Sequence, residues 1–184
     1  MTILKKMYLE KVVPELIKRF AYKNNELVPK MLKITVNIGA GDAHTNKQLL
    51  ESLHSDLSKI CGLKGVSTKS KKAISAFKVR EGNIVGLMAT LRGERMYDFA
   101  EKLISINIPR IRDFRGLSHK SFDGRGNYSF GFKEQMVFVE IPYETLSKSH
   151  GIQVTINTSA KNDAQAKALL ELLGFSFKKI ESVE

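Results

Sequence analysis

The segment of residues 107–133 interleaves arginine, aromatic and glycine residues without a sustained helical or strand period. Its planar guanidinium groups, which suit phosphate oxygens, belong to Arg110, Arg112, Arg115 and Arg125. The flat rings on which bases could stack belong to Phe114, Phe122, Tyr128 and Phe130. The glycines that let a bulky partner approach the backbone are Gly116, Gly124, Gly126 and Gly131. A loop this long inside a compact domain is commonly functional, and its composition predicts a surface shaped for RNA.

The overall charge also points to a partner rich in phosphate. The 184 residues carry 30 Lys and Arg against 19 Asp and Glu, a formal net charge of +11. Such an excess suits nucleic acid or an anionic membrane surface, although charge alone is equally consistent with a protein that is merely basic. The distribution of arginine favours nucleic acid, because of the eight arginines only Arg19 lies outside residues 80–125.

The length predicts one sizeable domain over residues 1–184, with an ordinary hydrophobic fraction of 42%. Cys61 is the single cysteine and ends an apolar helical pattern, so we interpret it as a small core side chain. The histidines show no metal-ligand spacing and are interpreted as structural or exposed: His44, His54, His119 and His150. No run is long enough to span a bilayer and the first residues lack the apolar core of a signal peptide, so we expect an intracellular protein.

The elements that must position these residues follow from hydrophobic periodicity. Residues 9–20 have helical spacing, which Pro14 should kink or restart. Residues 33–38 alternate as a half-buried strand, and residues 151–157 repeat that pattern. Ile34, Val36 and Ile38 are expected to point inward.

Three further helices and two further strands complete the expected fold. The helices cover residues 49–60, closed by Gly62, residues 93–109, and residues 162–174. Asn162 is a plausible N-cap, with Gln165 placed as in a capping box. The strands cover residues 84–92 and 136–139. This order of elements predicts an α+β fold with helices on one face of a mostly antiparallel sheet, and with long basic loops.

Short polar side chains occupy the outward faces of the two clearest strands: Thr35, Asn37, Gln153, Thr155 and Asn157. A merely solvated sheet face usually carries longer, charged side chains. Hydroxyls and amides instead permit close approach to 2′-hydroxyls, phosphates and base edges. Cross-strand pairing on a wet surface is the alternative, and only the neighbouring basic segments favour RNA over it.

Residues 64–82 form a second basic segment, in which six cations stand against the single acid Glu81: Lys64, Lys69, Lys71, Lys72, Lys78 and Arg80. Ile74 and Phe77 are set among them and would be exposed unless a partner covers them, and Gly82 suits a tight return. A solvated charge run is possible here, but the interleaved apolar groups favour a nucleic-acid contact.

The turn Gly39-Ala40-Gly41 is the one feature that suggests a nucleotide-binding enzyme. The third glycine of a dinucleotide fingerprint is missing, because His44 stands in its place, and no Gly-Lys-Ser/Thr follows. A tight turn whose N–H groups hold an RNA phosphate fits equally well. Without a metal-spaced cluster, an activated nucleophile or a carboxylate pair, we predict no enzyme, no metal and no cofactor. A membrane-surface binder ranks last, because the helices mix charges on their polar faces.

Five segments, in order and at family spacing, resemble the bacterial-type large-subunit ribosomal protein five, the family that binds 5S ribosomal RNA. They are Lys33–Gly41, Ala76–Gly82, Thr90–Arg95, Pro109–Leu117 and Ser121–Tyr128. The match runs from Tyr8 to Lys178. The resemblance implies a structural protein of the ribosome, in the cytoplasm or an organelle, that helps attach 5S ribosomal RNA in the central protuberance.

The resemblance also implies partners and the residues that meet them. Those expected to contact 5S ribosomal RNA are Lys33, Thr35, Asn37, Gly39, Gly41, Thr68, Thr90 and Arg92. Those expected to reach the peptidyl-site transfer RNA are Lys69, Lys71, Lys72, Phe77, Lys78 and Arg80. Those expected to meet large-subunit RNA or a small-subunit head protein, in an intersubunit bridge, are Arg110, Arg112, Arg115 and Arg125. Neighbouring 5S-binding ribosomal proteins are further expected partners. We expect no interaction with a membrane.

Several positions depart from the family pattern, Leu63 and Met88 among them. Leu63 stands where Gln is common, and it cannot supply the amide hydrogen bond that Gln would make. Met88 stands at a strand position that is often basic. These departures bear on individual contacts rather than on the resemblance as a whole.

Overall fold

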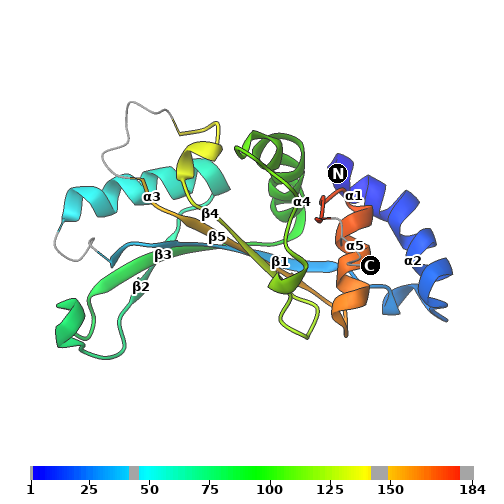
Figure 1. Cartoon of the computed structure of the whole chain (residues 1–184), viewed down its shortest axis with the longest axis horizontal. Coiled ribbons are helices and arrows are strands. Elements are labelled where there is room, and N and C mark those ends of the chain that lie inside the picture. The colour runs from blue at the N-terminus through cyan, green and yellow to red at the C-terminus, as the bar shows by residue number, and fades with distance from the viewer. Residues whose placement is uncertain (1, 42–45, 142–148, 179–184) are drawn as a thin grey trace, which may run out of the picture. The chain divides into compact units, whose positions relative to one another are not determined.

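The computed structural model describes residues 2–41, 46–141 and 149–178 (Figure 1). Its α-helices are α1 (Ile3–Met7), α2 (Val13–Phe20), α3 (Lys47–Cys61), α4 (Gly93–Lys102) and α5 (Asp163–Leu172). Its strands are β1 (Met31–Gly39), β2 (Val66–Lys69), β3 (Ile84–Leu91), β4 (Tyr128–Phe132) and β5 (Ile152–Thr158). The strands form one antiparallel sheet in the order β2-β3-β1-β5-β4, which confirms the α+β class. His44 lies outside the described residues.

The chain divides into two compact units. Unit 1 comprises Met1–Ile34, Arg92–Phe130 and Thr155–Glu184. Unit 2 comprises Thr35–Leu91 and Gly131–Val154. Each unit is assembled from segments distant in sequence, and β1, β4 and β5 contribute residues to both.

In unit 2, α3 covers one face of the sheet. Asn46 caps this helix, its side-chain oxygen accepting a hydrogen bond from Leu49 N at 3.2 Å. Gly62 ends it in the left-handed conformation, at φ +63°, as predicted. The buried side of α3 includes Leu53, Leu57 and Ile60, with Cys61 beside them in the core as expected. These side chains shield the inward side chains of the strands from water.

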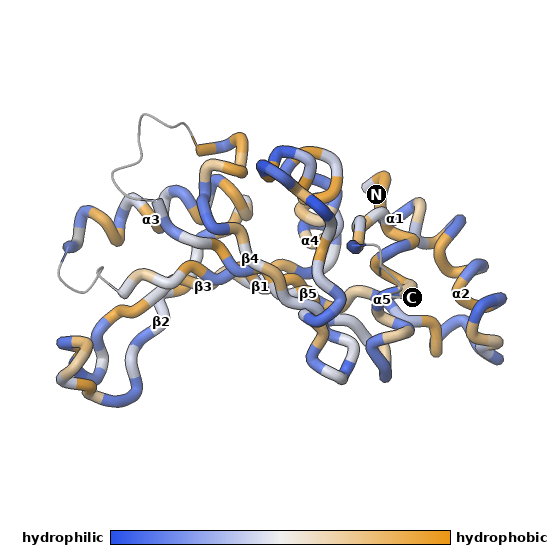
Figure 2. Tube along the Cα trace, viewed as in Figure 1, coloured by the Kyte–Doolittle hydropathy of each residue, from blue (hydrophilic) through white to orange (hydrophobic). Residues whose placement is uncertain are grey.

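In unit 1, three helical segments run on from one another: α1, a π-helix (Tyr8–Val12) and α2, with Pro14 in the first turn of α2 as predicted. The buried residues are Leu4, Tyr8, Val12 and Leu16, a spacing of four that the wider π turn permits. Figure 2 shows hydrophobic and hydrophilic residues alternating along these segments, as expected of helices with one buried side. The Tyr8 hydroxyl donates to Pro29 O at 3.1 Å, and burial raises the pKa of Tyr8 to about 12.

The strand predicted over residues 136–139 is wrong. Residues Gln135–Val137 form a 3-10 helix, followed by a turn. Phe138 is buried there, with its ring centroid 5.2 Å from that of Phe132. An apolar run of four residues is too short to distinguish a strand from a helical turn by its pattern.

The expectation that residues 107–133 lack regular structure is also wrong. They contain β4 and two 3-10 helices, Ile108–Arg110 and His119–Ser121. Tyr128, Phe130 and Phe132 alternate with Ser129 and Gly131, which is a strand pattern, but the Gly- and Arg-rich composition around it favoured a loop.

The cap expected for α5 is only partly present. Asn162 occupies the N-cap position, but its side chain makes no capping hydrogen bond. Gln165 reaches back with its side-chain oxygen to Lys161 N, at 3.3 Å, rather than to the N-cap itself. The helix ends at Leu172, before Gly174 at φ +105°.

Candidate nucleic-acid interface

The polar face of β1 and β3 in unit 2 carries several of the residues expected to bind RNA. On β1, Val36 and Ile38 are fully buried, while Thr35 and Asn37 lie half-exposed on the opposite face. On β3, Thr90 is likewise half-exposed between buried neighbours. The predicted inward and outward alternation of β1 is therefore confirmed.

The side chains on this polar face lack partners within the described part of the chain. Thr35, Asn37, Thr68 and Thr90 make no side-chain hydrogen bond to any described residue. Their hydroxyl and amide groups remain available to an external partner.

The outward face of β5 behaves differently. Thr155 Oγ1 lies 3.0 Å from Ser129 Oγ, and Asn157 Nδ2 donates to Asn127 Oδ1 at 3.1 Å. These are cross-strand polar pairs, the alternative that the sequence left open. Thr and Asn side chains thus pair within the chain on β5, whereas on β1 they have no partner among the described residues.

Gly86 brings the ends of three strands of unit 2 close together. The register pairs Thr68 of β2 with Gly86 of β3. A Cβ at Gly86 would come within 2.7 Å of Ile38 O and 3.0 Å of Thr68 Oγ1. The absence of a side chain therefore lets the Thr68 hydroxyl lie beside the end of β1. Gly86 was not among the predicted site residues, although a glycine inside a strand signals close backbone approach.

A backbone hydrogen bond from Ala40 holds the turn after β1, which contains Gly39 and Gly41. Ala40 is buried and donates its N–H to Val85 O at 3.0 Å. A Cβ added at Gly39 or Gly41 would meet nothing within 4 Å. Packing among the described residues therefore does not require glycine at these two positions.

The basic segment predicted over residues 64–82 comprises β2 and the hairpin tip that joins β2 to β3 (Figure 1). Ser70 N–H donates to Asn83 O at 2.8 Å, and Ser70 accepts from Gly82 N–H at 3.0 Å. The tip closes through a bridge between Ile74 and Val79 around the 3-10 helix Ser75–Phe77. Hydrogen bonds therefore hold the tip in one backbone conformation.

The exposure expected at this tip is confirmed. Phe77 is 71% exposed and Ile74 46% exposed. The cations around them are also exposed: Lys69, Lys71, Lys72, Lys78 and Arg80. An exposed ring among cations suits a partner that combines phosphate with flat bases.

A network of backbone hydrogen bonds shapes the loop that carries Arg125. Asp123 Oδ1 accepts from Arg125 N at 2.8 Å and from Asn127 N at 3.0 Å. Asp123 Oδ2 accepts from Asn127 Nδ2 at 2.6 Å, and these hydrogen bonds lower the pKa of Asp123. Asp163 at the start of α5 accepts from Gly124 N at 3.1 Å and Gly126 N at 2.9 Å.

The same network accounts for two of the glycines in the segment. Gly126 has φ +79°, and a Cβ there would meet Ala160 O at 2.7 Å, so only glycine fits. Gly124 has φ +82° in open space. Internal geometry, rather than a bulky partner, thus explains Gly126. The Arg125 side chain is exposed on a loop whose backbone is held in place.

The prediction that Tyr128 offers a stacking face to bases is wrong, whereas Phe122 is half-exposed. Tyr128 is fully buried, its ring centroid lies 4.6 Å from that of Phe122, and burial raises its pKa to about 12. Phe177 joins this cluster from the C-terminal segment, 5.4 Å from Tyr128. Alternation of rings with Gly and Arg in sequence did not reveal this packing, because Phe177 is distant in the chain.

The arginines that precede this cluster are displayed on irregular backbone. Arg110 ends a 3-10 helix, and Arg112 and Arg115 follow it, all three exposed. Leu117 pairs with Phe177 in a single parallel bridge, which ties down the end of this run. No carboxylate of a described residue pairs with any of the four predicted guanidinium groups, which include that of Arg125.

Lys33 and Arg92, the other positions expected to bind 5S ribosomal RNA, belong to unit 1, while Met88 and Leu63, the departures from the family pattern, belong to unit 2. Lys33 is half-exposed on β1, and Arg92 is exposed at the N-cap of α4. Met88 is 36% exposed and pairs directly with Val66, 65% exposed, so this part of β2 and β3 presents an apolar patch. Leu63 is half-buried and lines a groove beside His54.

Comparison with known proteins accounts for nearly the whole chain. The model of the ribosomal protein L5 family matches residues 24–80, and a second model, that of the C-terminus of the same family, matches residues 84–177. The chain is 51% identical over 175 residues to the large ribosomal subunit protein uL5 of Ralstonia pickettii, covering 95% of this chain and 97% of that protein. The chain belongs to the ribosomal protein L5 family.

Other relatives agree with this assignment. The uL5 protein of Rippkaea orientalis is 52% identical over 175 residues, covering 95% of this chain and 97% of that protein. The uL5 protein of a Nostoc species is 51% identical over 177 residues, covering 96% and 97%. Family membership confirms the resemblance. It identifies the chain as a structural protein of the large ribosomal subunit rather than an enzyme, located with the ribosomes in the cytoplasm.

The described residues also bear on membrane-spanning segments and metal sites. No helix among them is long and apolar enough to cross a membrane. No group of three or more His, Cys, Asp and Glu among the residues that the structure describes could hold a metal ion.

The loop network predicts a contrast between two neighbouring residues at the start of α5. Asp163→Ala should lower the free energy of unfolding by about 1–3 kcal/mol, because it leaves the buried Gly126 N–H without its acceptor. Asn162→Ala should cost much less than the usual cap loss of about 1 kcal/mol, because Asn162 makes no capping bond. Urea unfolding of both variants measures the difference, and equal losses would contradict the network.

Proposed function

We propose that the polar face of β1 and β3 is a binding surface for 5S ribosomal RNA, and that the chain acts there as a single domain. The residues assigned to it are Lys33, Thr35, Asn37, Gly39, Gly41, Thr68, Thr90 and Arg92. The observation that carries the proposal is the set of hydroxyls and one amide on this face without partners among the described residues. Bound RNA would supply those partners and help anchor its 5S component in the central protuberance.

The chemistry of this face fits RNA better than it fits solvent or a phosphate loop. Hydroxyl and amide groups can both donate and accept, as the ribose 2′-hydroxyl and base edges require. The space beside the Gly39 backbone admits a sugar-phosphate chain. Lys33 and Arg92 add the positive charge that phosphates require.

Asn37→Ala should weaken binding of 5S ribosomal RNA by about 1–3 kcal/mol, because a polar group of the RNA then loses its partner. Asn157→Ala is the matched control, since its amide is already paired with Asn127 inside the chain. Filter binding with purified full-length protein measures both affinities, and thermal melting confirms that both variants fold. Equal affinities for the Asn37 and Asn157 variants would remove Asn37 from the interface.

The hairpin tip of residues 69–80 is proposed to contact the peptidyl-site transfer RNA, through Lys69, Lys71, Lys72, Phe77, Lys78 and Arg80. Its ordered backbone holds five cations and an exposed ring without internal partners for the ring. Cations suit the phosphates, and Phe77 offers a face to an accessible base or ribose.

Replacing Lys71 and Lys72 together by Gln should leave 5S binding intact but weaken retention of transfer RNA in the peptidyl site of assembled ribosomes. Loss of two phosphate contacts predicts about a tenfold effect at moderate salt. Lys18→Gln with Lys23→Gln removes the same charge from an exposed part of unit 1 and serves as control. Loss of both activities together in the Lys71 and Lys72 variant would mean that the tip is not a separate site.

The arginines at 110, 112, 115 and 125 are proposed to face large-subunit RNA or a protein of the small-subunit head, in an intersubunit bridge. Support comes from their exposure, from their lack of carboxylate partners among the described residues, and from the network that holds the Arg125 loop. Neighbouring 5S-binding ribosomal proteins are proposed as further partners.

A further inference from the structure

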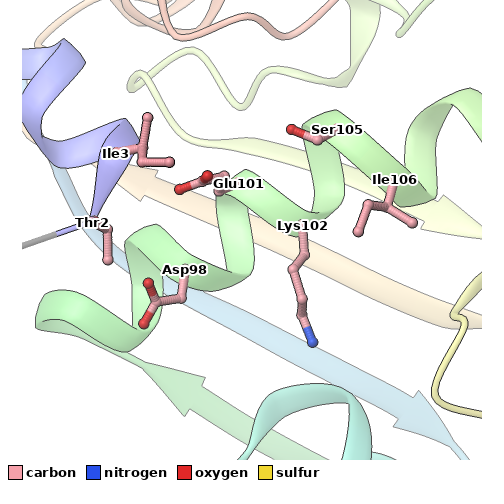
Figure 3. A pocket seen from close by; sticks show the side chains of 7 residues that line it. All are labelled: Thr2, Ile3, Asp98, Glu101, Lys102, Ser105 and Ile106. Carbon is pink, nitrogen blue, oxygen red and sulfur yellow. The ribbon is translucent and has the colours of Figure 1, made fainter.

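A groove in unit 1 lies outside every surface assigned so far. It has a volume of about 440 Å³ and opens between the start of α1 and the outer side of α4 with the π-helix that follows, Leu103–Asn107 (Figure 3). Ile3 lines one side, and Asp98, Glu101 and Ile106 line the other. No residue predicted to bind RNA contributes to it.

Both sides of the groove carry an exposed branched apolar side chain. Ile3 is 76% exposed and Ile106 is 42% exposed. Exposed apolar side chains on two sides of one groove are typical of a surface that a partner covers. The π-helical turn displays Ile106, and such turns are frequent at functional sites.

The charge of the groove is opposite to that of the chain. Asp98 and Glu101 stand three residues apart and therefore share one side of α4. Asp98 has no hydrogen-bond or ion-pair partner among the described residues. Glu101 uses one oxygen to accept from Leu4 N at 3.4 Å, which leaves its other oxygen available. Among the described residues that line the groove, Lys102 is the one cation, in a chain of net charge +11.

We propose that this groove receives a segment of another protein of the large subunit, with a Lys or Arg beside an apolar residue. The carboxylates of Asp98 and Glu101 would repel an RNA backbone, so RNA is a poor occupant. They would pair with the cation, while the apolar side chain fits between Ile3 and Ile106. Ribosomal proteins carry basic segments because they bind RNA, so neighbouring proteins of the large subunit can supply a segment with this composition.

The test uses purified large subunits that carry Ile106→Cys in a Cys61→Ser background. Maleimide labelling of Cys at position 106 should be about tenfold slower in the subunit than in the free protein, because a covering segment excludes the reagent. A photoactivatable benzophenone maleimide, attached to the free protein before subunit reconstitution, should then crosslink to a protein peptide that contains Lys or Arg beside an apolar residue. Mass spectrometry identifies the peptide.

Charge reversal separates the proposed contact from a chance neighbour. Asp98→Lys should lower the crosslink yield by about tenfold, because like charges across an interface cost that much or more. Glu15→Lys makes the same change at an exposed carboxylate of α2 and should leave the yield unchanged. Both variants should still bind 5S ribosomal RNA. Loss of the crosslink with 5S binding intact therefore concerns the groove alone, and not the proposed RNA-binding face.

Three results would overturn the proposal. Equal labelling in the subunit and the free protein would show that the groove stays open. A crosslink to RNA would show that RNA covers it despite the carboxylates. A crosslinked peptide without Lys or Arg, or one insensitive to Asp98→Lys, would show that charge does not select the occupant.

Discussion

The pleat of β1 places apolar side chains on one face of the strand and polar side chains on the other. Both the stability of unit 2 and its proposed function depend on that separation. Val36 and Ile38 turn to the side that α3 covers and are fully buried. Thr35 and Asn37 turn to the other side, where no described residue satisfies them. A shift of one residue in register would exchange the two sets, so the core fixes which groups face outward. The apolar face therefore positions the polar one.

The hairpin tip and the loop of Arg125 are held by hydrogen bonds, although neither is a long helix or strand. Backbone hydrogen bonds through Ser70 hold the hairpin tip, and carboxylates of Asp123 and Asp163 hold the loop of Arg125. An ordered loop loses less conformational entropy when it binds, so charge displayed this way binds more strongly than charge on a mobile chain. In the Arg125 loop, two carboxylates of this basic chain serve to shape the backbone that carries a cation.

Local pattern was sufficient for much of the fold. Alternation located β1 and β5, and helical spacing with Gly62 located α3 and its end. Contacts between distant segments were not accessible to such reasoning. The burial of Tyr128 depends on Phe177, and the pairing of Asn157 depends on Asn127. Without those partners in view, a ring and an amide were assigned to RNA that the fold uses internally.

The most direct test of the account is the salt dependence of the affinity for 5S ribosomal RNA. If about six cations neutralise phosphates, the affinity should fall about a thousandfold between about 50 mM and 200 mM salt. The same titration with Asn37→Ala should give a parallel line at lower affinity, because that side chain contributes no charge. An affinity that hardly changes over this range would contradict the claim that the chain is built to bind a folded polyanion.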